Sequence, residues 1–227
     1  MLNILIARLI AVAIVLTEVP GGWPIYMQTN VANGWPHVSH VVAPSAPFNV
    51  VIGNTVFALA TVNGDGEVSN VRVVQGVTPF AEETVHAVSQ WQFTPVGRTG
   101  KSARTEVSVL VMFRPHAFGN FGVGGPTLGF ATPPIPSGDH PVLPVLLFDP
   151  GWPIVSALRD GVVMFEVEIA KDGSMHEVRV LRDIPPTTDF ARKTLEQWKF
   201  APAVTGGQPV DSKIVVAISF VTPVIPC

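Results

Sequence analysis

Apolar and polar residues alternate with a period of two along residues 162–170. Val163, Phe165, Val167 and Ile169 alternate with Met164, Glu166, Glu168 and Ala170, the pattern of a half-buried strand. Asp172-Gly173 follows, a pair that favours a tight hairpin turn. Residues 175–182 then resume the alternation, with Val178 and Val180 on the apolar side. This stretch predicts a β-hairpin.

A helix and a third strand follow the hairpin. The prolines of DIPPTT end the sheet pattern, and Thr188 is placed to cap a helix that begins at Asp189. Ala191, Leu195 and Trp198 then recur at helical spacing and form one apolar stripe. After a Gly/Pro loop, Lys213–Phe220 alternates again as a strand. The predicted unit is ββαβ: a three-stranded antiparallel sheet packed against a helix, of the α+β class.

The same pattern occurs earlier in the chain. An offset of 107 aligns residues 54–113 with 161–220 without a gap, and 14 of the 60 aligned positions are identical. One motif, Trp-x-Phe-x-Pro, is shared in full: Trp91, Phe93 and Pro95 match Trp198, Phe200 and Pro202. We interpret these residues as structural: the Trp seals the helix to the sheet, and the Pro ends regular structure. A period above 100 residues indicates tandem domains.

The expected organisation has five parts. Residues 1–17 are a signal-like or anchor segment, 18–47 an uncharged approach segment, 48–114 the first domain, 115–150 a Gly/Pro-rich linker, and 151–222 the second domain. The first domain is divergent, because its outer face is less polar: Phe57 and Leu59 lie around the position of the outward Glu166, and Leu110 and Met112 take the positions of Ala217 and Ser219. We expect its sheet to be covered on both faces, with the preceding uncharged segment as the candidate cover.

Charge and composition narrow the function classes. The net charge is −3, and only 14% of residues are charged, which gives no basis for nucleic-acid binding. Neither the stretch between Glu18 and Asp65 nor the one between Arg114 and Asp139 contains an Asp, Glu, Lys or Arg. Their apolar content favours packing on protein or membrane over disorder. Residues 1–17 contain Arg8 and are short for a spanning helix, so an export signal, a short anchor, a buried helix and a mis-set start codon stay open.

Candidate catalytic and metal-binding chemistry is sparse. Cys227 is the only cysteine, which excludes an intrachain disulfide, and no His-Glu-x-x-His or Gly-x-Ser-x-Gly pattern is present. His37 and His40 are expected to have surface or structural roles. Glu166 and Glu168 are interpreted as charges on an exposed strand face, and Arg72 and Arg179 as solvated, with a peptide-facing cation as the alternative. We therefore predict no catalytic residues, no metal site and no small-molecule cofactor.

Several motifs of the second copy together resemble the C-terminal domain of TonB-type energy transducers. They are Trp152-Pro153, Ala157, Gly161, Asp172-Gly173, Val178-Arg179-Val180, Trp198-Lys199-Phe200-x-Pro202, Gly207 and Phe220. The resemblance implies a periplasmic, non-enzymatic domain that takes part in TonB-dependent transport by binding a peptide of an outer-membrane receptor. In that family the peptide adds a strand beside the last strand of the domain, which is β-augmentation.

The resemblance places a peptide-binding site at the last strand and its approach. The site residues expected by position are Lys213, Val215, Ala217 and Ser219, together with Trp152, Pro153 and Ala157. The alternative function is a structural or assembly module whose domains pair edge to edge, within one chain or as a homodimer. The expected location is the periplasm or cell envelope, with membrane association through residues 1–17.

Overall fold

A computed structural model describes residues 35–47, 53–95, 104–114, 133–148 and 159–220. Both copies form the predicted ββαβ unit. Copy one contains β2 (Asn54–Asn63), β3 (Val68–Gln75), α1 (Phe80–Val88) and β5 (Arg104–Phe113). Copy two contains β7 (Gly161–Ile169), β8 (Met175–Arg182), α2 (Thr187–Leu195) and β12 (Ser212–Phe220). The α+β prediction is confirmed.

Short strands complete the fold: β1 (Val38–His40), β4 (Gln92–Phe93), β6 (Leu143–Leu146), β9 (Lys199–Ala201), β10 (Ala203–Thr205) and β11 (Gln208–Val210). They pair as β1·β4, β6·β9 and β10·β11. The linker predicted at 115–150 therefore contributes a strand from its described part. Residues 1–34 lie outside the described residues, so the predicted anchor segment and much of the approach segment do as well.

The second helix begins earlier than its capping pattern predicts. It starts at Thr187 after Pro186, and no side chain caps it. The Thr188 hydroxyl instead accepts a hydrogen bond from the Ile184 N–H (2.7 Å) and so closes the preceding turn. Ala191 and Leu195 are buried on the predicted stripe, whereas Trp198 lies just beyond the end of the helix.

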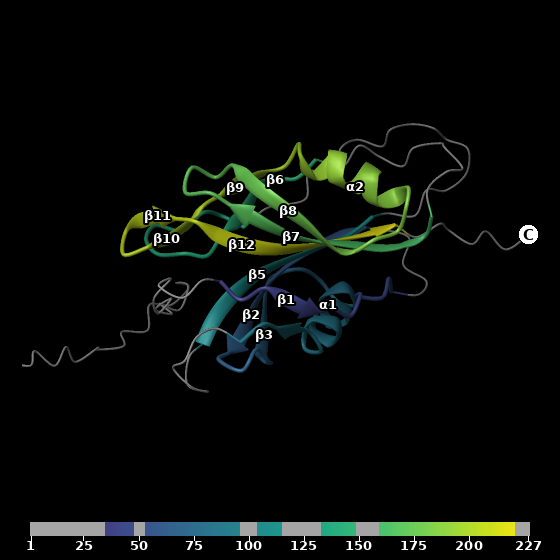
Figure 1. The fold of residues 1–227 in the computed structure, drawn as a ribbon, viewed down its shortest axis with the longest axis horizontal. Helices are drawn as coiled ribbons and strands as arrows, with labels where there is room; N and C mark the ends of the chain where they lie inside the picture. The colour runs from purple at the N-terminus through teal and green to yellow at the C-terminus, as the bar shows by residue number, and fades with distance from the viewer. Residues whose placement is uncertain (1–34, 48–52, 96–103, 115–132, 149–158, 221–227) are drawn as a thin grey trace, which may run out of the picture.

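The two antiparallel sheets join into one sheet of six strands, in the order β3-β2-β5-β12-β7-β8 (Figure 1). The join is between the last strands of the two copies: β12 pairs with β5 in parallel and with β7 antiparallel. The two expected three-stranded sheets are both present, and they pair edge to edge within one chain, as in the alternative interpretation of the sequence. The result is one continuous sheet, because each copy occupies the free edge of the other.

The register of the join turns the two copies to opposite faces. Ile214 corresponds to Val107 in the repeat (214 − 107 = 107) but pairs with Ser108. Paired residues point to the same side of a sheet, so this one-residue offset places equivalent side chains on opposite faces. Consequently α1 covers one face and α2 the other (Figure 1). Each of the two cores contains strand residues from both copies.

The apolar outer face of copy one is buried as predicted, but under a different segment. Phe57, Leu59, Leu110 and Met112 belong to the α2-side core together with Val142, Leu143 and Leu147. The cover is therefore the segment that follows copy one in the chain, and the expectation that the preceding segment covers it is wrong. The register offset is the reason, because it brings the approach to copy two across this face.

Candidate functional site

The Trp-x-Phe motif fastens the segment that precedes each copy. Trp91 Nε1 donates to the Val42 carbonyl oxygen and Trp198 Nε1 to that of Phe148, both at 2.8 Å. Two residues on, Phe93 pairs with Val38, and Phe200 pairs with Pro144. The motif thus seals the core, as predicted, and also holds a preceding strand, which the sequence did not reveal.

The Asp-Gly turn of each hairpin packs against this motif. Gly66 and Gly173 have φ of +92° and +84°. A Cβ added at Gly173 would lie 2.5 Å from the Phe200 carbonyl oxygen, and one at Gly66 would meet the carbonyl oxygen of Phe93. The Phe93 N–H also donates to the Gly66 carbonyl (2.8 Å). The turn and the motif recur together because they are in contact.

We expect Gly173→Ala to destabilise the protein more than Gly206→Ala. Both glycines have positive φ, which costs an L-residue about 1–2 kcal/mol. Only Gly173 faces a backbone oxygen; nothing lies within 4 Å of a Cβ at Gly206. Overpacking at Gly173 adds about 1–3 kcal/mol. Urea unfolding of both variants measures the difference, and equal losses would contradict the contact.

Residues 35–47, which we call the N-terminal strap, cross from copy one to the sheet of copy two. The strap pairs with copy one through β1·β4 and through the hydrogen bond from Trp91 Nε1 to the Val42 carbonyl oxygen. On copy two, the Val38 N–H donates to Glu166 Oε2 (3.0 Å), and Arg179 Nη2 donates to the Val38 carbonyl (3.0 Å). The strap therefore joins the two copies on the α1 side of the sheet.

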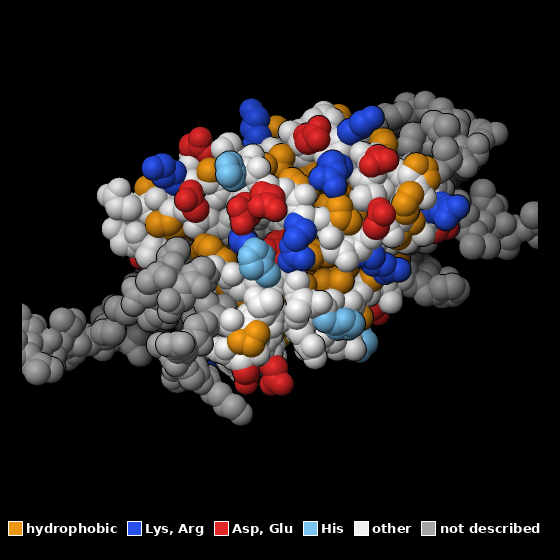
Figure 2. All heavy atoms as spheres, viewed as in Figure 1, with side chains coloured by type: hydrophobic (Ala, Val, Ile, Leu, Met, Phe, Trp, Pro, Cys, Tyr) orange, Lys and Arg blue, Asp and Glu red, His pale blue; other side chains and the backbone are white. Residues whose placement is uncertain are grey.

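Glu166 is the centre of the polar contacts beneath the strap. Its side chain is 3% exposed, and it contacts His37 Nδ1 (2.8 Å), Lys213 Nζ (3.1 Å) and Arg179. Lys213 is 8% exposed and also contacts Glu168 Oε1 at 2.9 Å. Figure 2 shows acidic, basic and histidine side chains gathered near the middle of this face. The prediction that Glu166 lies on an exposed face is wrong, because the strap covers this part of the sheet, whereas the Arg179 side chain contacts Glu166 and stays 40% exposed.

Charge compensation keeps Glu166 ionised. Burial raises the pKa of this carboxyl, but hydrogen bonds from the Val38 N–H, Lys213 and Arg179 outweigh burial and hold the pKa below its usual value. A buried carboxylate with two cations is a satisfied cluster. Within the described residues this cluster binds the strap.

Residues 139–148, the linker strap, make the equivalent crossing on the other face. This strap pairs with copy two through β6·β9 and through His140, which exchanges backbone hydrogen bonds with Val204 (3.0 and 2.8 Å). On copy one, Ser108 Oγ donates to the Val142 carbonyl (3.0 Å), and Leu143 is fully buried. The contacts of this strap on copy one are mainly apolar.

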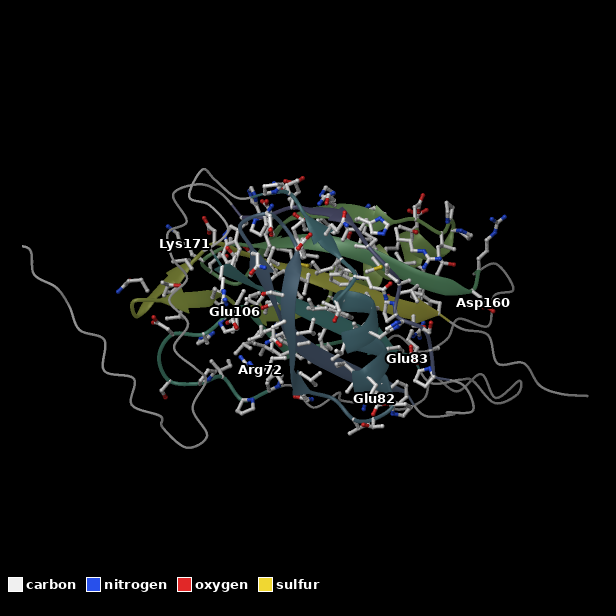
Figure 3. The ribbon with its side chains drawn as sticks, turned by 90° about the horizontal axis from the view of Figure 1, so that it is seen from below. Arg72, Glu82, Glu83, Glu106, Asp160 and Lys171 are labelled. Carbon is white, nitrogen blue, oxygen red and sulfur yellow. The ribbon has the colours of Figure 1, made fainter. Side chains whose placement is uncertain are left out.

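The repeat explains why the two straps differ in polarity. Glu166 corresponds to Leu59, and Lys213 corresponds to Glu106 (213 − 107 = 106). Burial raises the pKa of Glu106, and the charge of Arg72 partly offsets that effect. Arg72 and Glu106 are labelled in Figure 3. Copy one has therefore exchanged the carboxylate centre for an aliphatic one.

The structure brings together four of the predicted peptide-site residues, but not at an open edge. Lys213, Val215, Ala217 and Ser219 lie on β12, which is paired on one side with β7 and, from Ile214 to Ser219, on the other with β5. All four are buried. The expectation of a free edge at this strand is wrong, because β5 occupies it. Trp152, Pro153 and Ala157 lie outside the described residues.

The open edges of the sheet are at its two ends. In the described part of the chain β3 pairs only with β2, and β8 only with β7. These edges are equivalent, because Val68 corresponds to Met175 (68 + 107 = 175). Unpaired N–H and C=O groups on an edge strand can accept another strand. The edges are thus the geometrically available sites for strand addition.

Among the described residues, no group of three His, Cys, Asp or Glu side chains is arranged to hold a metal ion. No helix in those ranges is long and apolar enough to cross a membrane.

Comparison with known families accounts for the repeat. The family model described as the Gram-negative bacterial TonB protein C-terminal domain matches twice, over residues 52–115 and 156–222. A search of curated proteins found no match. The two matches cover more than half of the chain and coincide with the two ββαβ units. The chain therefore belongs to the TonB C-terminal domain family and carries two tandem copies of this non-catalytic, periplasmic transducer domain.

Proposed function

We propose that this protein takes part in TonB-dependent transport by binding an extended segment of an outer-membrane receptor through strand addition at β3. The observation that carries the proposal is the pairing of β5 with β12, which leaves the strand-adding capacity of both domains at the outer edges of one sheet. Main-chain hydrogen bonds supply affinity in such complexes, so a distinctive set of side chains is not required.

The side chains of the two outer strands favour β3 as the peptide edge. β3 presents Val68, Val71, Val73 and Val74, and its only charge is Arg72. β8 carries Glu177, Arg179 and Arg182 besides His176. Charges on an edge strand discourage indiscriminate strand pairing, whereas β-branched residues favour it. An extended, mainly apolar receptor segment is therefore better matched to β3.

The edge expected from the family pattern requires a rearrangement in this chain. A peptide beside Lys213–Ser219 would have to displace β5 from six residue pairs with β12. It would also separate the inner strands of both cores. Addition of a peptide at β3 leaves both the β5–β12 pairing and the two cores intact. We place the protein in the periplasm, and an anchor within residues 1–17 is part of the proposal.

A peptide titration of the full chain tests the site. We expect a synthetic TonB-box-type receptor peptide, added up to about 1 mM, to shift the amide NMR signals of residues 68–75. The same peptide N-methylated at alternate residues is the matched control, since it keeps the side chains but cannot pair. Shifts at residues 104–113 and 213–219 would instead place the peptide between β5 and β12. Unchanged spectra would refute the proposed function.

One observation favours a second candidate function, an assembly module. Edge-to-edge pairing of the two domains occurs within the chain, between β5 and β12. A protein that bound no receptor peptide but associated through its remaining edges would fit this function.

A further inference from the structure

We propose that β8 is an edge through which two molecules of this protein associate. The β8 strands of the two molecules pair antiparallel, with Val178 of each molecule on the two-fold axis. The inference concerns a different edge from the proposed peptide site and does not depend on it. It rests on the charges that lie in rows across the sheet toward β8.

The first row runs across β12, β7 and β8 and ends at Glu177 on β8. The residue beside Glu177 on β7 is another acidic residue, not a cation. Lys213, Glu168 and Glu177 stand side by side on β12, β7 and β8. Lys213 Nζ contacts Glu168 Oε1 at 2.9 Å, so the cation is on the inner side of the row. Glu177 directly opposes Glu168, a like-charge pair that is unfavourable between neighbouring strands. A cation next to Glu177 on an added strand would offset the repulsion between Glu177 and Glu168.

The second row ends on a cation. Val215, Glu166 and Arg179 stand side by side on the same three strands. The Arg179 side chain contacts Glu166 yet is 40% exposed. An anion on the added strand next to Arg179 would therefore be favourable. An antiparallel strand meets both conditions when an acidic residue precedes a basic residue by two positions.

β8 itself has this sequence, Glu177-Val178-Arg179. In an antiparallel pair of β8 strands centred on Val178, Glu177 of each molecule opposes Arg179 of the other molecule, and two ion pairs form. Centring on Arg179 or Glu177 sets like charges opposite each other, and centring on Val180 sets Glu177 against Asp183. Charge thus selects one register among its neighbours.

The equivalent edge and the local contacts support this assignment. β3 has Asn70 where β8 has Glu177, so it lacks the self-complementary pattern. Near β8, Arg192 Nη1 makes a long bond (3.4 Å) to the Val178 carbonyl oxygen, which can also accept from a partner N–H. The pairing gives a closed two-fold dimer. Both β3 edges lie at the outer ends of the joined sheet and stay accessible.

Charge reversal at Glu177 tests the dimer. We expect the wild-type full chain to associate in sedimentation equilibrium below about 1 mM, more weakly at high salt. Glu177→Arg places the new arginine of each molecule opposite Arg179 of the other molecule, and it should raise the dimer dissociation constant at least about tenfold. It also removes the clash with Glu168, so it should not unfold the chain. Glu82→Arg is the matched control: it makes the same charge change on exposed α1 (Figure 3) and should leave association unchanged.

Hydrogen exchange gives an independent measurement. We expect amide protection of residues 175–182 to rise with protein concentration, while that of residues 68–75 stays constant. A wild-type chain that remains monomeric throughout the concentration range would overturn the proposal. So would a dimer that Glu177→Arg does not weaken, or concentration-dependent protection confined to residues 68–75.

Discussion

Trp198→Ala should lower the free energy of unfolding by about 3–5 kcal/mol, the usual cost of truncating a large buried aromatic residue. The indole is 4% exposed and lies in the α2-side core. Its ring packs near that of Phe200 (centroids 6.5 Å apart), and its N–H bonds the Phe148 carbonyl. The truncation therefore opens a cavity and also releases the linker strap. Urea unfolding followed by circular dichroism measures the loss.

Trp198→Phe separates these two contributions. Phenylalanine keeps most of the ring volume but cannot donate to Phe148, so this variant should lose less than the alanine variant. Its strap should nevertheless loosen, and hydrogen exchange over residues 139–148 would report it. A loss under about 1 kcal/mol for Trp198→Ala would be incompatible with a buried core position.

Glu166→Ala should cost a comparable amount, about 3–5 kcal/mol, because removing one partner of a buried ion pair leaves the other uncompensated. Lys213 would stay buried and keep the more exposed Glu168 as its carboxylate partner, and Arg179 and the Val38 N–H would each lose an acceptor. Glu168→Ala is the control. It removes the outer carboxylate, which is 33% exposed, and should cost at most about 1 kcal/mol. Equal losses in the two variants would mean that Glu166 has no special part in holding the strap.

The same cluster predicts the direction of a pH effect. The folded pKa of Glu166 is lowered, so its stabilising contribution is complete above the unfolded value, about 4.3, and is lost as pH falls through the folded pKa. The stability difference between wild type and Glu166→Gln should therefore be largest near neutral pH and shrink below about pH 4. A difference that grows on acidification would contradict an ionised Glu166.

The sequence predicts the units of this fold well and their connection poorly. Alternation along 163–169, the Asp-Gly turns and the Trp-x-Phe motif are local signals, and they identify each ββαβ unit almost to the residue. The parallel pairing of β5 with β12 is set by contacts between residues more than 100 positions apart. Alternation predicts that a strand has two faces, but it does not specify which strand occupies each edge.

The polar cluster was missed for a related reason. Period-two alternation assigns Glu166 to the outer face, and an outer face normally meets water. The signal that could have corrected this assignment is the length of the uncharged approach segment, whose backbone groups need partners wherever they are buried. Leu59, which in copy one corresponds to Glu166, was the clearer indication, because an apolar residue on the outer face predicts that the face is covered. The covering segment itself was predicted wrongly.

The order of the strands has a consequence for synthesis. β12 is the last strand of the described chain, yet it is inserted near the centre of the sheet, between β5 and β7. While copy one emerges from the ribosome, the edge of β5 and the apolar surface of Phe57, Leu59, Leu110 and Met112 have no cover. Exposed edges and apolar faces of incomplete chains are the surfaces that aggregate and that chaperones bind. Until Phe220 has been translated, this edge and this apolar surface therefore stay available for such contacts.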